Sequence, residues 1–311
     1  MESRKKGSAG KMTETAKRME RRQFVRRICL WVLAVVLVIS CTSLGRQFWQ
    51  RMFRVAEFGG SMGTPLSIHV LDVGKADAIL IECNGHIALL DAGTDAHGET
   101  VVDYMSRHNM KSLDYAIVSH PDKDHLGGMA QVLSEVDATS FVRSPYFGEK
   151  YETFLREMEG KTVRDRVVLP GDILPLGDAV LRIMGPLEQY EDTNNGSLVI
   201  RLEYQGFTAL FCGDIEKEAE RDLVDANSEL LSADLLKVPH HGSKSSCTKR
   251  FLRAVSPQLA VVSVGQDSSK LPSEDTLQRL DDFCEDVYRT DTDGTVIFAF
   301  DGAELQITTE H

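Results

Sequence analysis

The sequence has 311 residues, of which 42% are hydrophobic and 26% charged, and its formal net charge is −12 at pH 7. Such a composition is typical of a globular protein with room for one large domain and an appendage. Residues 1–54 hold 13 of the 35 Lys and Arg but only 3 of the 47 acidic residues, so residues 55–311 carry 22 basic and 44 acidic side chains. This balance excludes a general nucleic-acid platform, because phosphate contacts need Lys and Arg. It leaves open a nuclease whose bound metal ions dominate the local field.

The amino-terminal segment has the pattern of a membrane anchor. Residues 1–27 form a polar tail rich in Lys and Arg, and residues 28–45 are an uncharged run of 18 residues, near the minimum for a membrane span. Basic residues before a span favour a cytoplasmic amino terminus. We therefore expect a single-pass transmembrane helix in a bacterial cell membrane, a spacer at residues 46–65 and a domain at residues 66–311 on the extracytoplasmic side.

A cleaved lipoprotein signal is the alternative for the same segment. The sequence Val38-Ile39-Ser40-Cys41 resembles a lipobox, in which Cys41 would carry the lipid. Both interpretations place the domain on the outer face of the membrane.

The first part of the domain predicts strands separated by tight turns. Residues 66–74, 78–82 and 86–93 fit three antiparallel strands with Gly turns. Residues 99–105 have helical periodicity, and the apolar run at residues 113–118 is typical of a buried strand.

A cluster of potential metal ligands follows that run. His120, Asp122, Asp124 and His125 fall within six residues, between the predicted strand and a predicted helix at residues 129–133. Such a loop presents ligands to a cleft from a rigid scaffold. Neutral imidazoles suit Zn, Mn and Fe, and carboxylates add a preference for harder ions. A shared cation explains the cluster best, and a polar loop with two capping aspartates is the alternative.

This stretch resembles the His-x-His-x-Asp-His signature of the metallo-β-lactamase superfamily. Asp122 replaces the second His, which resembles the competence-protein (ComEC-type) branch with its His-x-Asp-x-Asp-His-x-Gly-Gly. The resemblance extends from about Leu66 to Thr308 and includes an Asp-x-Gly element, where Asp91 is expected to brace the metal loop rather than bind the ion. The opening resembles Leu-Asp-Val-Gly-Gln-Gly-Asp, from which Lys75 and Ala76 depart.

Two later strands end in further expected ligands. Residues 207–214 form an apolar run ending in Gly-Asp, and the resemblance implies that Asp214 bridges two metals; a helix cap is the alternative. Residues 233–243 resemble Leu-Lys-Val-x-His-His-Gly-Ser. There, one His, which we expect to be His241, would bind the second metal, and His240 could donate a proton to a leaving group.

Three polar side chains are expected near the substrate. Residues 194–199 resemble Asn-Asn-x-Ser-Leu-Val, where lactamases place another His, so Asn195 or Ser197 could bind a metal weakly or contact substrate. A turn entering a strand is the alternative. Ser243 could hold a substrate oxygen. Leu271 stands where the branch usually has His before Pro, and an aliphatic group can neither ligate a metal nor relay a proton.

The resemblance implies a four-layer αββα sandwich that holds two divalent ions, Zn or Mn, and no organic cofactor. One ion would take His120 and Asp122, the other would take Asp124, His125 and His241, and Asp214 would lie between them. The expected reaction is phosphodiester hydrolysis, with Asp124 and His240 as catalytic residues. Extracellular DNA or a smaller phosphoester would be the substrate, and β-lactam hydrolysis is a third option. The other reading is a membrane-tethered binding domain with an incomplete, weak metal site.

Overall fold

The computed structural model describes residues 65–161, 163–266, 268 and 270–310. The chain divides into two compact units, Met1–Gly60 and Ser61–His311, and the described residues all belong to the second. The expected tail, the anchor with its alternative lipid site at Cys41 and nearly all of the spacer lie outside the described residues. Among the residues that are described, no helix has the length and apolarity needed to cross a membrane.

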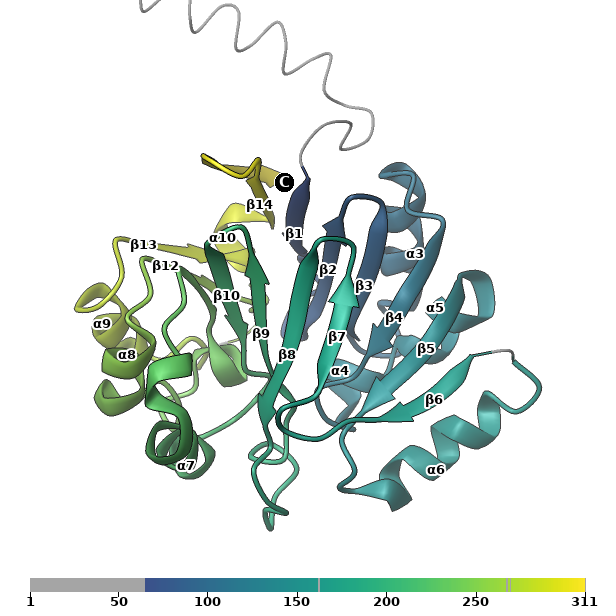
Figure 1. Ribbon diagram of the computed structural model, residues 1–311, viewed down its shortest axis with the longest axis horizontal. Helices are drawn as coiled ribbons and strands as arrows, with labels where there is room; N and C mark the ends of the chain where they lie inside the picture. Colours follow the sequence, from purple (N-terminus) through teal and green to yellow (C-terminus); the bar gives the residue numbers. More distant parts are fainter. Residues whose placement is uncertain (1–64, 162, 267, 269, 311) are drawn as a thin grey trace, which may run out of the picture. The chain divides into compact units, whose positions relative to one another are not determined.

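Two sheets form the centre of this unit (Figure 1). The first has the order β15-β14-β1-β2-β3-β4-β5-β6, and the second has the order β13-β12-β11-β10-β9-β8-β7. The strands of the first sheet are β1 (Leu66–Val70), β2 (Ala78–Cys83), β3 (His86–Ala92), β4 (Ser112–Ile117), β5 (Asp137–Arg143), β6 (Arg164–Val167), β14 (Thr295–Phe300) and β15 (Leu305–Glu310). Those of the second are β7 (Ile173–Leu176), β8 (Ala179–Gly185), β9 (Val199–Tyr204), β10 (Phe207–Phe211), β11 (Leu235–Lys237), β12 (Leu259–Val262) and β13 (Asp286–Arg289).

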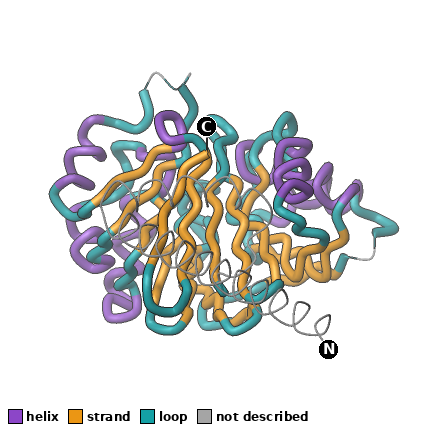
Figure 2. Tube along the Cα trace, turned by 90° about the horizontal axis from the view of Figure 1, so that it is seen from above, coloured by secondary structure: helices purple, strands orange, loops and turns teal. Residues whose placement is uncertain are grey.

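Helices flank the two sheets, as the view from above shows (Figure 2). The helices beside the first sheet are α3 (Gly98–Arg107), α4 (Lys123–Leu126), α5 (Met129–Glu135) and α6 (Gly148–Glu157). The helices beside the second sheet are α7 (Lys217–Asn227), α8 (Lys249–Val255) and α9 (Glu274–Asp281). The short α10 (Thr290–Asp293) precedes β14. Two 3-10 turns, Ser228–Leu230 and Pro239–Gly242, complete the elements.

Three apolar clusters account for this layering. Successive side chains of a strand point to opposite faces, and in β2 Ile79 and Ile81 join the cluster between the sheets, whereas Leu80 joins the cluster beneath α3 and α5. A third cluster fills the space between the second sheet and α7, α8 and α9. Both sheets are therefore buried on two faces, which gives the expected helix–sheet–sheet–helix order.

Several local predictions are confirmed and one is wrong. β1 pairs antiparallel with β2, and β2 with β3, as the Gly turns predict. The helices predicted at residues 99–105 and 129–133 are α3 and α5. The apolar residues at 167–172 also predict a strand with turn punctuation, and this prediction is wrong, because β6 ends at Val167 and a turn follows, with Gly171 at φ 94°. Pro170 in this turn has no N–H to give to a sheet.

The ends of parallel strands position the polar loops. β3, β4 and β5 run parallel in the first sheet, and β10, β11, β12 and β13 run parallel in the second. The loop with His120 follows β4, Asp214 follows β10, and His241 follows β11. Parallel strands end at the same edge of a sheet, so both sheets bring their loops to one end of the sandwich.

One fully buried carboxylate lies between α7 and the end of the loop that carries His241. Glu220 in α7 has no exposed surface, and it accepts hydrogen bonds from the backbone N–H groups of Cys247 and Thr248 before α8. Burial raises the pKa of Glu220 to about 7, and the two donors offset part of this effect. The carboxyl group therefore links the stability of the helical layer to pH.

We predict that the unfolding free energy falls as pH rises from 4.5 to about 7, the interval between the ordinary and the folded pKa of Glu220. In that interval the unfolded chain ionises the group whereas the folded chain keeps its proton, which costs on the order of 3 kcal/mol in total. Denaturant titrations at several pH values in this range should show that the unfolding free energy of Glu220→Gln falls less with pH than that of the wild type. Equal slopes would contradict the assignment.

Candidate metal centre

Backbone hydrogen bonds join the loops at this end of the sandwich. The N–H of Leu198, before β9, donates to the carbonyl of Ser119, after β4, at 2.8 Å. The N–H of His240 donates to the carbonyl of Gly213 at 3.1 Å. The first bond links the two sheets and the second links two loops of the same sheet, so the side chains between them have little freedom.

Three residues around this end of the sandwich have a left-handed backbone. The φ angles are 60° for Asp91, 52° for His240 and 50° for His241. Such conformations cost about 1–3 kcal/mol each in residues other than glycine and collect at functional sites. The two neighbouring histidines turn the chain sharply after β11, which points their rings toward Asp214.

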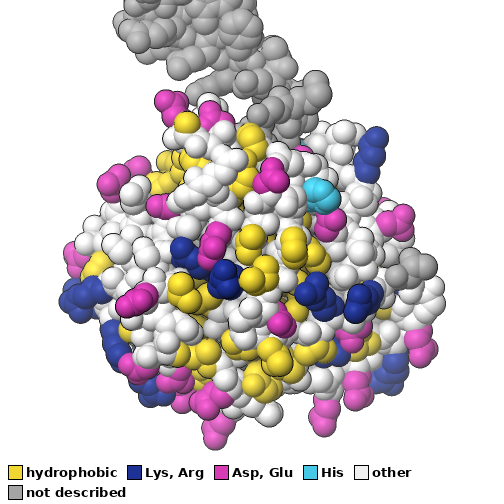
Figure 3. Space-filling view, viewed as in Figure 1, with side chains coloured by type: hydrophobic (Ala, Val, Ile, Leu, Met, Phe, Trp, Pro, Cys, Tyr) yellow, Lys and Arg dark blue, Asp and Glu magenta, His cyan; other side chains and the backbone are white. Residues whose placement is uncertain are grey.

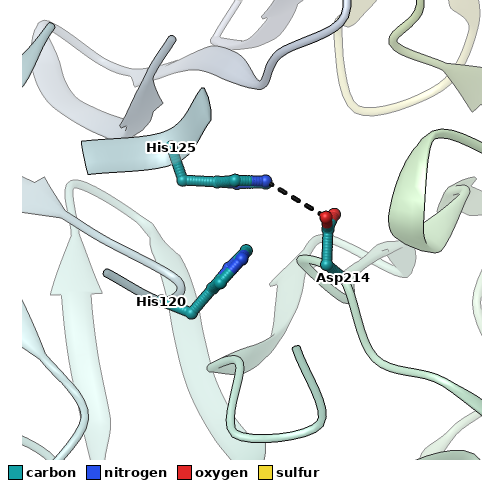
Figure 4. A group of neighbouring side chains, drawn as sticks. All are labelled: His120, His125 and Asp214. Carbon is teal, nitrogen blue, oxygen red and sulfur yellow. Dashed lines mark ion pairs between the residues drawn. The ribbon is translucent and has the colours of Figure 1, made fainter. Parts of the chain in front are cut away.

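Three imidazole rings surround the Asp214 carboxylate. His125 Nε2 lies 3.4 Å and His241 Nε2 3.7 Å from Asp214 Oδ2. Figure 4 shows the rings of His120 and His125 pointing toward this carboxylate, and their centroids are 4.1 Å apart. All three histidines and Asp214 are buried.

In each of the three rings, Nδ1 already has a hydrogen-bond partner. His125 Nδ1 lies 2.8 Å from Asp91 Oδ2, and His241 Nδ1 lies 2.9 Å from the carbonyl oxygen of Ser263. His120 Nδ1 contacts two serine hydroxyls, those of Ser119 at 3.1 Å and Ser197 at 3.2 Å. Since a carbonyl or carboxylate can only accept, the Nδ1 atoms of His125 and His241 carry protons there.

The Nε2 atoms of the three rings and one oxygen of Asp214 lack hydrogen-bond partners. His120 Nε2, His125 Nε2, His241 Nε2 and Asp214 Oδ1 are buried with no hydrogen-bond partner among the described residues. Buried polar atoms normally find partners, and leaving one unpaired costs about 1–3 kcal/mol. Divalent cations bound there would give these atoms partners, and imidazole with carboxylate is a donor set that suits Zn or Mn. The residues present therefore fit the metal ions that the sequence predicts.

Electrostatics around Asp214 favour ionisation. Burial opposes the charge, but His125 and His241 lower the pKa of Asp214 well below its usual value. Burial also works against protonation of His125, yet the carboxylates of Asp214 and Asp91 raise its pKa well above the usual value. Burial, with His125 nearby, lowers the pKa of His120 to about 4. Without a cation, the cluster thus holds a proton on His125, which a metal must displace.

Possible ligand atoms gather in three overlapping groups, one of which consists of Asp77, Asp91 and His125. The other two consist of residues that the sequence predicts as ligands. His120, His125 and Asp214 bring ligand atoms within 4.8 Å of one another, and so do Asp124, His125 and His241. His125 belongs to both groups, but Asp91 holds its Nδ1, so its single free nitrogen can serve one ion. Two ions would therefore have to divide these groups between them.

The two outer aspartates of the motif pair with lysines. Asp124 Oδ2 lies 3.0 Å from Lys75 Nζ and 3.6 Å from His241 Nε2. Asp122 Oδ1 accepts from Lys150 at 3.2 Å and Thr193 at 3.0 Å, and its Oδ2 lies 3.8 Å from His120 Nε2. Asp124 is thus part of a ligand group, whereas Asp122 lies at its edge and its ligand role stays a prediction.

The polar atoms of Asn195 and Ser197 have partners within the protein, and their expected contacts with substrate or metal stay a prediction. Asn195 Oδ1 accepts from the backbone N–H groups of Glu216 and Ala219 at the start of α7, and its Nδ2 donates to Asp192. Ser197 Oγ accepts from the N–H of Asp214 and contacts His120 Nδ1. These side chains position α7 and two site residues.

Two further expected positions are now located. The hydroxyl of Ser243 lies 2.8 Å from that of Ser245, and its substrate contact stays a prediction. Leu271 is half-buried and packs against the apolar cluster of the second sheet, and a Cβ on Gly242 would approach Pro272 to 2.6 Å. The segment after Leu271 therefore packs directly on the His-His-Gly loop.

His240 is the one histidine of this loop that reaches solvent. Its side chain is 21% exposed, and its Nε2 lies 3.9 Å from Asp214 Oδ2. Its Nδ1 lies 3.0 Å from Glu216 Oε1. A partly exposed imidazole with a carboxylate behind it suits proton transfer better than metal binding.

A buried ion pair beside the cluster was missed from the sequence. Lys237 Nζ lies 2.9 Å from Asp77 Oδ2, and both side chains are at most 2% exposed. Burial opposes the charge on Asp77, but Lys237 and His241 lower its pKa. The sequence does contain features that point to these two residues, because Lys237 interrupts an apolar strand and Asp77 is the last residue of the Leu-Asp-Val-Gly-x-x-Asp element.

Comparison with known proteins agrees with this geometry. The family model described as the metallo-β-lactamase superfamily matches residues 71–266. The chain belongs to the metallo-β-lactamase superfamily. The solved structure of the metallo-β-lactamase fold protein YhfI from Bacillus subtilis covers 72% of this chain and 96% of its own, with a TM-score of 0.50 and 12% identity. At that identity the likeness supports the fold alone.

Sequence relatives point to the competence-type branch. ComE operon protein 3 from Bacillus subtilis is 28% identical over 259 residues, which are 75% of this chain and 33% of that protein. Competence protein ComA from Neisseria gonorrhoeae is 29% identical over 235 residues, 75% of this chain and 32% of its own. The chain thus spans about a third of the length of these relatives, and the matches are consistent with a ComEC-type domain of the superfamily.

We predict that Asp91→Asn weakens zinc binding about 10- to 100-fold. The Asp91 carboxylate accepts from the N–H and the hydroxyl of Ser119 and from His125, and an amide cannot serve all three. Competition with a chelator measures the affinity. Asp165→Asn, at the Arg143 ion pair in the first sheet, is the control. Equal affinities for both variants would contradict a bracing role of Asp91.

Gly213→Ala should destabilise the domain by about 1–3 kcal/mol and lower its zinc content. Gly213 has φ 52°, and a Cβ there would lie 2.7 Å from the Cβ of Ser197 and 3.0 Å from that of Ser119. Gly206→Ala is the matched control, since Gly206 has φ 93° but no atom within 4 Å of the added carbon. Thermal unfolding and metal analysis should show a larger loss of stability and of zinc for Gly213→Ala than for Gly206→Ala.

Proposed function

We propose that the domain hydrolyses phosphodiesters with the help of divalent metal ions. The observation that carries the proposal is the set of buried, unpartnered nitrogen and oxygen atoms around Asp214. His120, His125, His241 and Asp214 would hold the metal, with Asp124 as a further ligand. A bound divalent cation would supply a Lewis acid that polarises a phosphoryl oxygen and activates water.

The chain's own residues would then handle orientation and protons. Asp91 and the Ser263 carbonyl keep the Nδ1 atoms of His125 and His241 protonated, so the opposite nitrogens stay available. His240, backed by Glu216, is placed to give a proton to the leaving oxygen. Such general acid catalysis contributes about 10²–10⁴-fold in rate.

DNA and a small phosphoester are the two substrate classes to separate. The names of two relatives, Competence protein ComA and Recombination protein 2 of Haemophilus influenzae, favour DNA. The acidic composition of residues 55–311 favours a smaller ester. On the face drawn in Figure 3, acidic, basic and apolar side chains intermix. On the basis of the amino-terminal sequence, we place this activity on the outer face of a bacterial membrane.

A binding role without turnover is the second candidate. It is favoured by Leu271, which fills with an apolar side chain the position where the branch usually has His. It is also favoured by Asp122, whose carboxylate is engaged by Lys150 and Thr193. Such a domain would bind metal and an anionic ligand and release the ligand unchanged.

We predict zinc- or manganese-dependent hydrolysis of bis(p-nitrophenyl) phosphate by the purified full-length chain, lost with a chelator and restored by the ion. His240→Gln should lower kcat about 10²–10⁴-fold while retaining the metal, because His240 is placed as a proton donor. Asp214→Asn should lose both the bound metal and the activity. Metal analysis and initial rates give the measurements.

The same preparation separates the alternatives. If an oligonucleotide is the substrate, its cleavage should fall steeply between 50 and 200 mM salt, because counterion release governs binding. Turnover of the small ester should change much less. Bound metal without turnover of either compound supports the binding role, and a protein that binds no metal overturns the proposal.

A further inference from the structure

The buried pair Asp77–Lys237 joins the two sheets beneath the metal centre. Asp77 lies in the loop before β2, and Lys237 is the last residue of β11. Besides the 2.9 Å contact between them, Lys237 Nζ donates to the carbonyl of Val238 at 2.9 Å. The backbone N–H of Asp77 donates to the carbonyl of Asp124 at 3.1 Å. The pair is therefore fixed against two loops of the centre.

One oxygen of this pair has no partner. Asp77 Oδ1 is buried, makes no hydrogen bond to a described residue and lies 3.6 Å from His241 Nδ1. A buried ion pair is weak evidence for stability, because desolvation offsets its attraction. A buried carboxylate oxygen without a donor adds to that cost. Fold stability alone therefore does not explain why the pair is there.

His241 supplies an explanation. Its Nδ1 proton is held by the Ser263 carbonyl at 2.9 Å, and the unpartnered Asp77 Oδ1 lies 3.6 Å from the same nitrogen, just beyond hydrogen-bond distance. A carboxylate behind a metal-binding histidine raises the basicity of the ring and fixes its orientation. The cluster already contains one such arrangement, Asp91 behind His125 at 2.8 Å.

We propose that Asp77 is a positioning residue that strengthens metal binding through His241, and that Lys237 balances its charge while no cation is bound. With a cation held at His241 Nε2, the Nδ1 proton would be a stronger donor, and Asp77 would share it with the Ser263 carbonyl. The inference rests on the proposed metal centre, since it concerns one of its ligands.

The test measures zinc affinity of the purified full-length chain by chelator competition in four variants. Asp77→Asn leaves the Lys237 charge beside the cation and should bind zinc most weakly. Lys237→Met leaves an unbalanced carboxylate and should bind zinc more tightly than wild type, although it unfolds at lower temperature. The double variant should bind zinc about tenfold or more weakly than wild type. Asp165→Asn, at the Arg143 ion pair in the first sheet, should leave the affinity unchanged.

The double variant decides between two explanations. It removes both charges, so a purely electrostatic effect of the pair predicts wild-type affinity, and that result would overturn the inference. A wild-type protein that binds no zinc removes the proposed metal centre and the inference together. If the variants do not fold, imidazole ¹H–¹⁵N spectra of the wild type replace them. The Nδ1 proton of His241 should move downfield when zinc is added, and an unmoved proton contradicts the sharing with Asp77.

Discussion

The Nε2 atoms of His120, His125 and His241 meet around the Asp214 carboxylate inside the protein, while oxygen atoms hold the opposite side of each ring. Buried nitrogen and oxygen atoms without hydrogen-bond partners are unfavourable, and backbone hydrogen bonds tie the loops that carry them across both sheets. A cation bound among these atoms would offset the cost of leaving them unpaired. Folding would thus prepare the site that a metal completes.

The architecture explains why no single segment can build this site. His120 and His125 come from the first sheet, whereas Asp214 and His241 come from the second. Only face-to-face packing of the sheets, through the apolar cluster between them, brings the four together. The left-handed backbone at His240 and His241 adds local strain that this packing must hold in place.

Much of this was readable from the sequence, because strand periodicity, glycine turns and ligand spacing are local signals. They predict β1 to β3, α3, α5 and the polar loop after β4. The residues missed are those whose role depends on contacts between distant segments. Asp77 and Lys237 form their pair across the two sheets, and Asn195 caps α7 some twenty residues later in the chain. No periodicity records such contacts, and the resemblance of residues 194–199 to Asn-Asn-x-Ser-Leu-Val suggested only a metal or substrate contact for Asn195 and Ser197.

The charges around the cluster constrain what can bind there. Its carboxylates are those of Asp77, Asp91, Asp124 and Asp214, and the ammonium groups paired with them are those of Lys75 and Lys237. With neutral histidines, two negative charges remain, and the proton held by His125 in the absence of metal neutralises only one of them. One divalent cation neutralises both. A second cation would leave two positive charges in a largely buried site, which is costly unless an anion accompanies it. A phosphodiester is such an anion, so the charge balance favours the same class of substrate as the donor set, and it couples binding of the second ion to binding of the substrate.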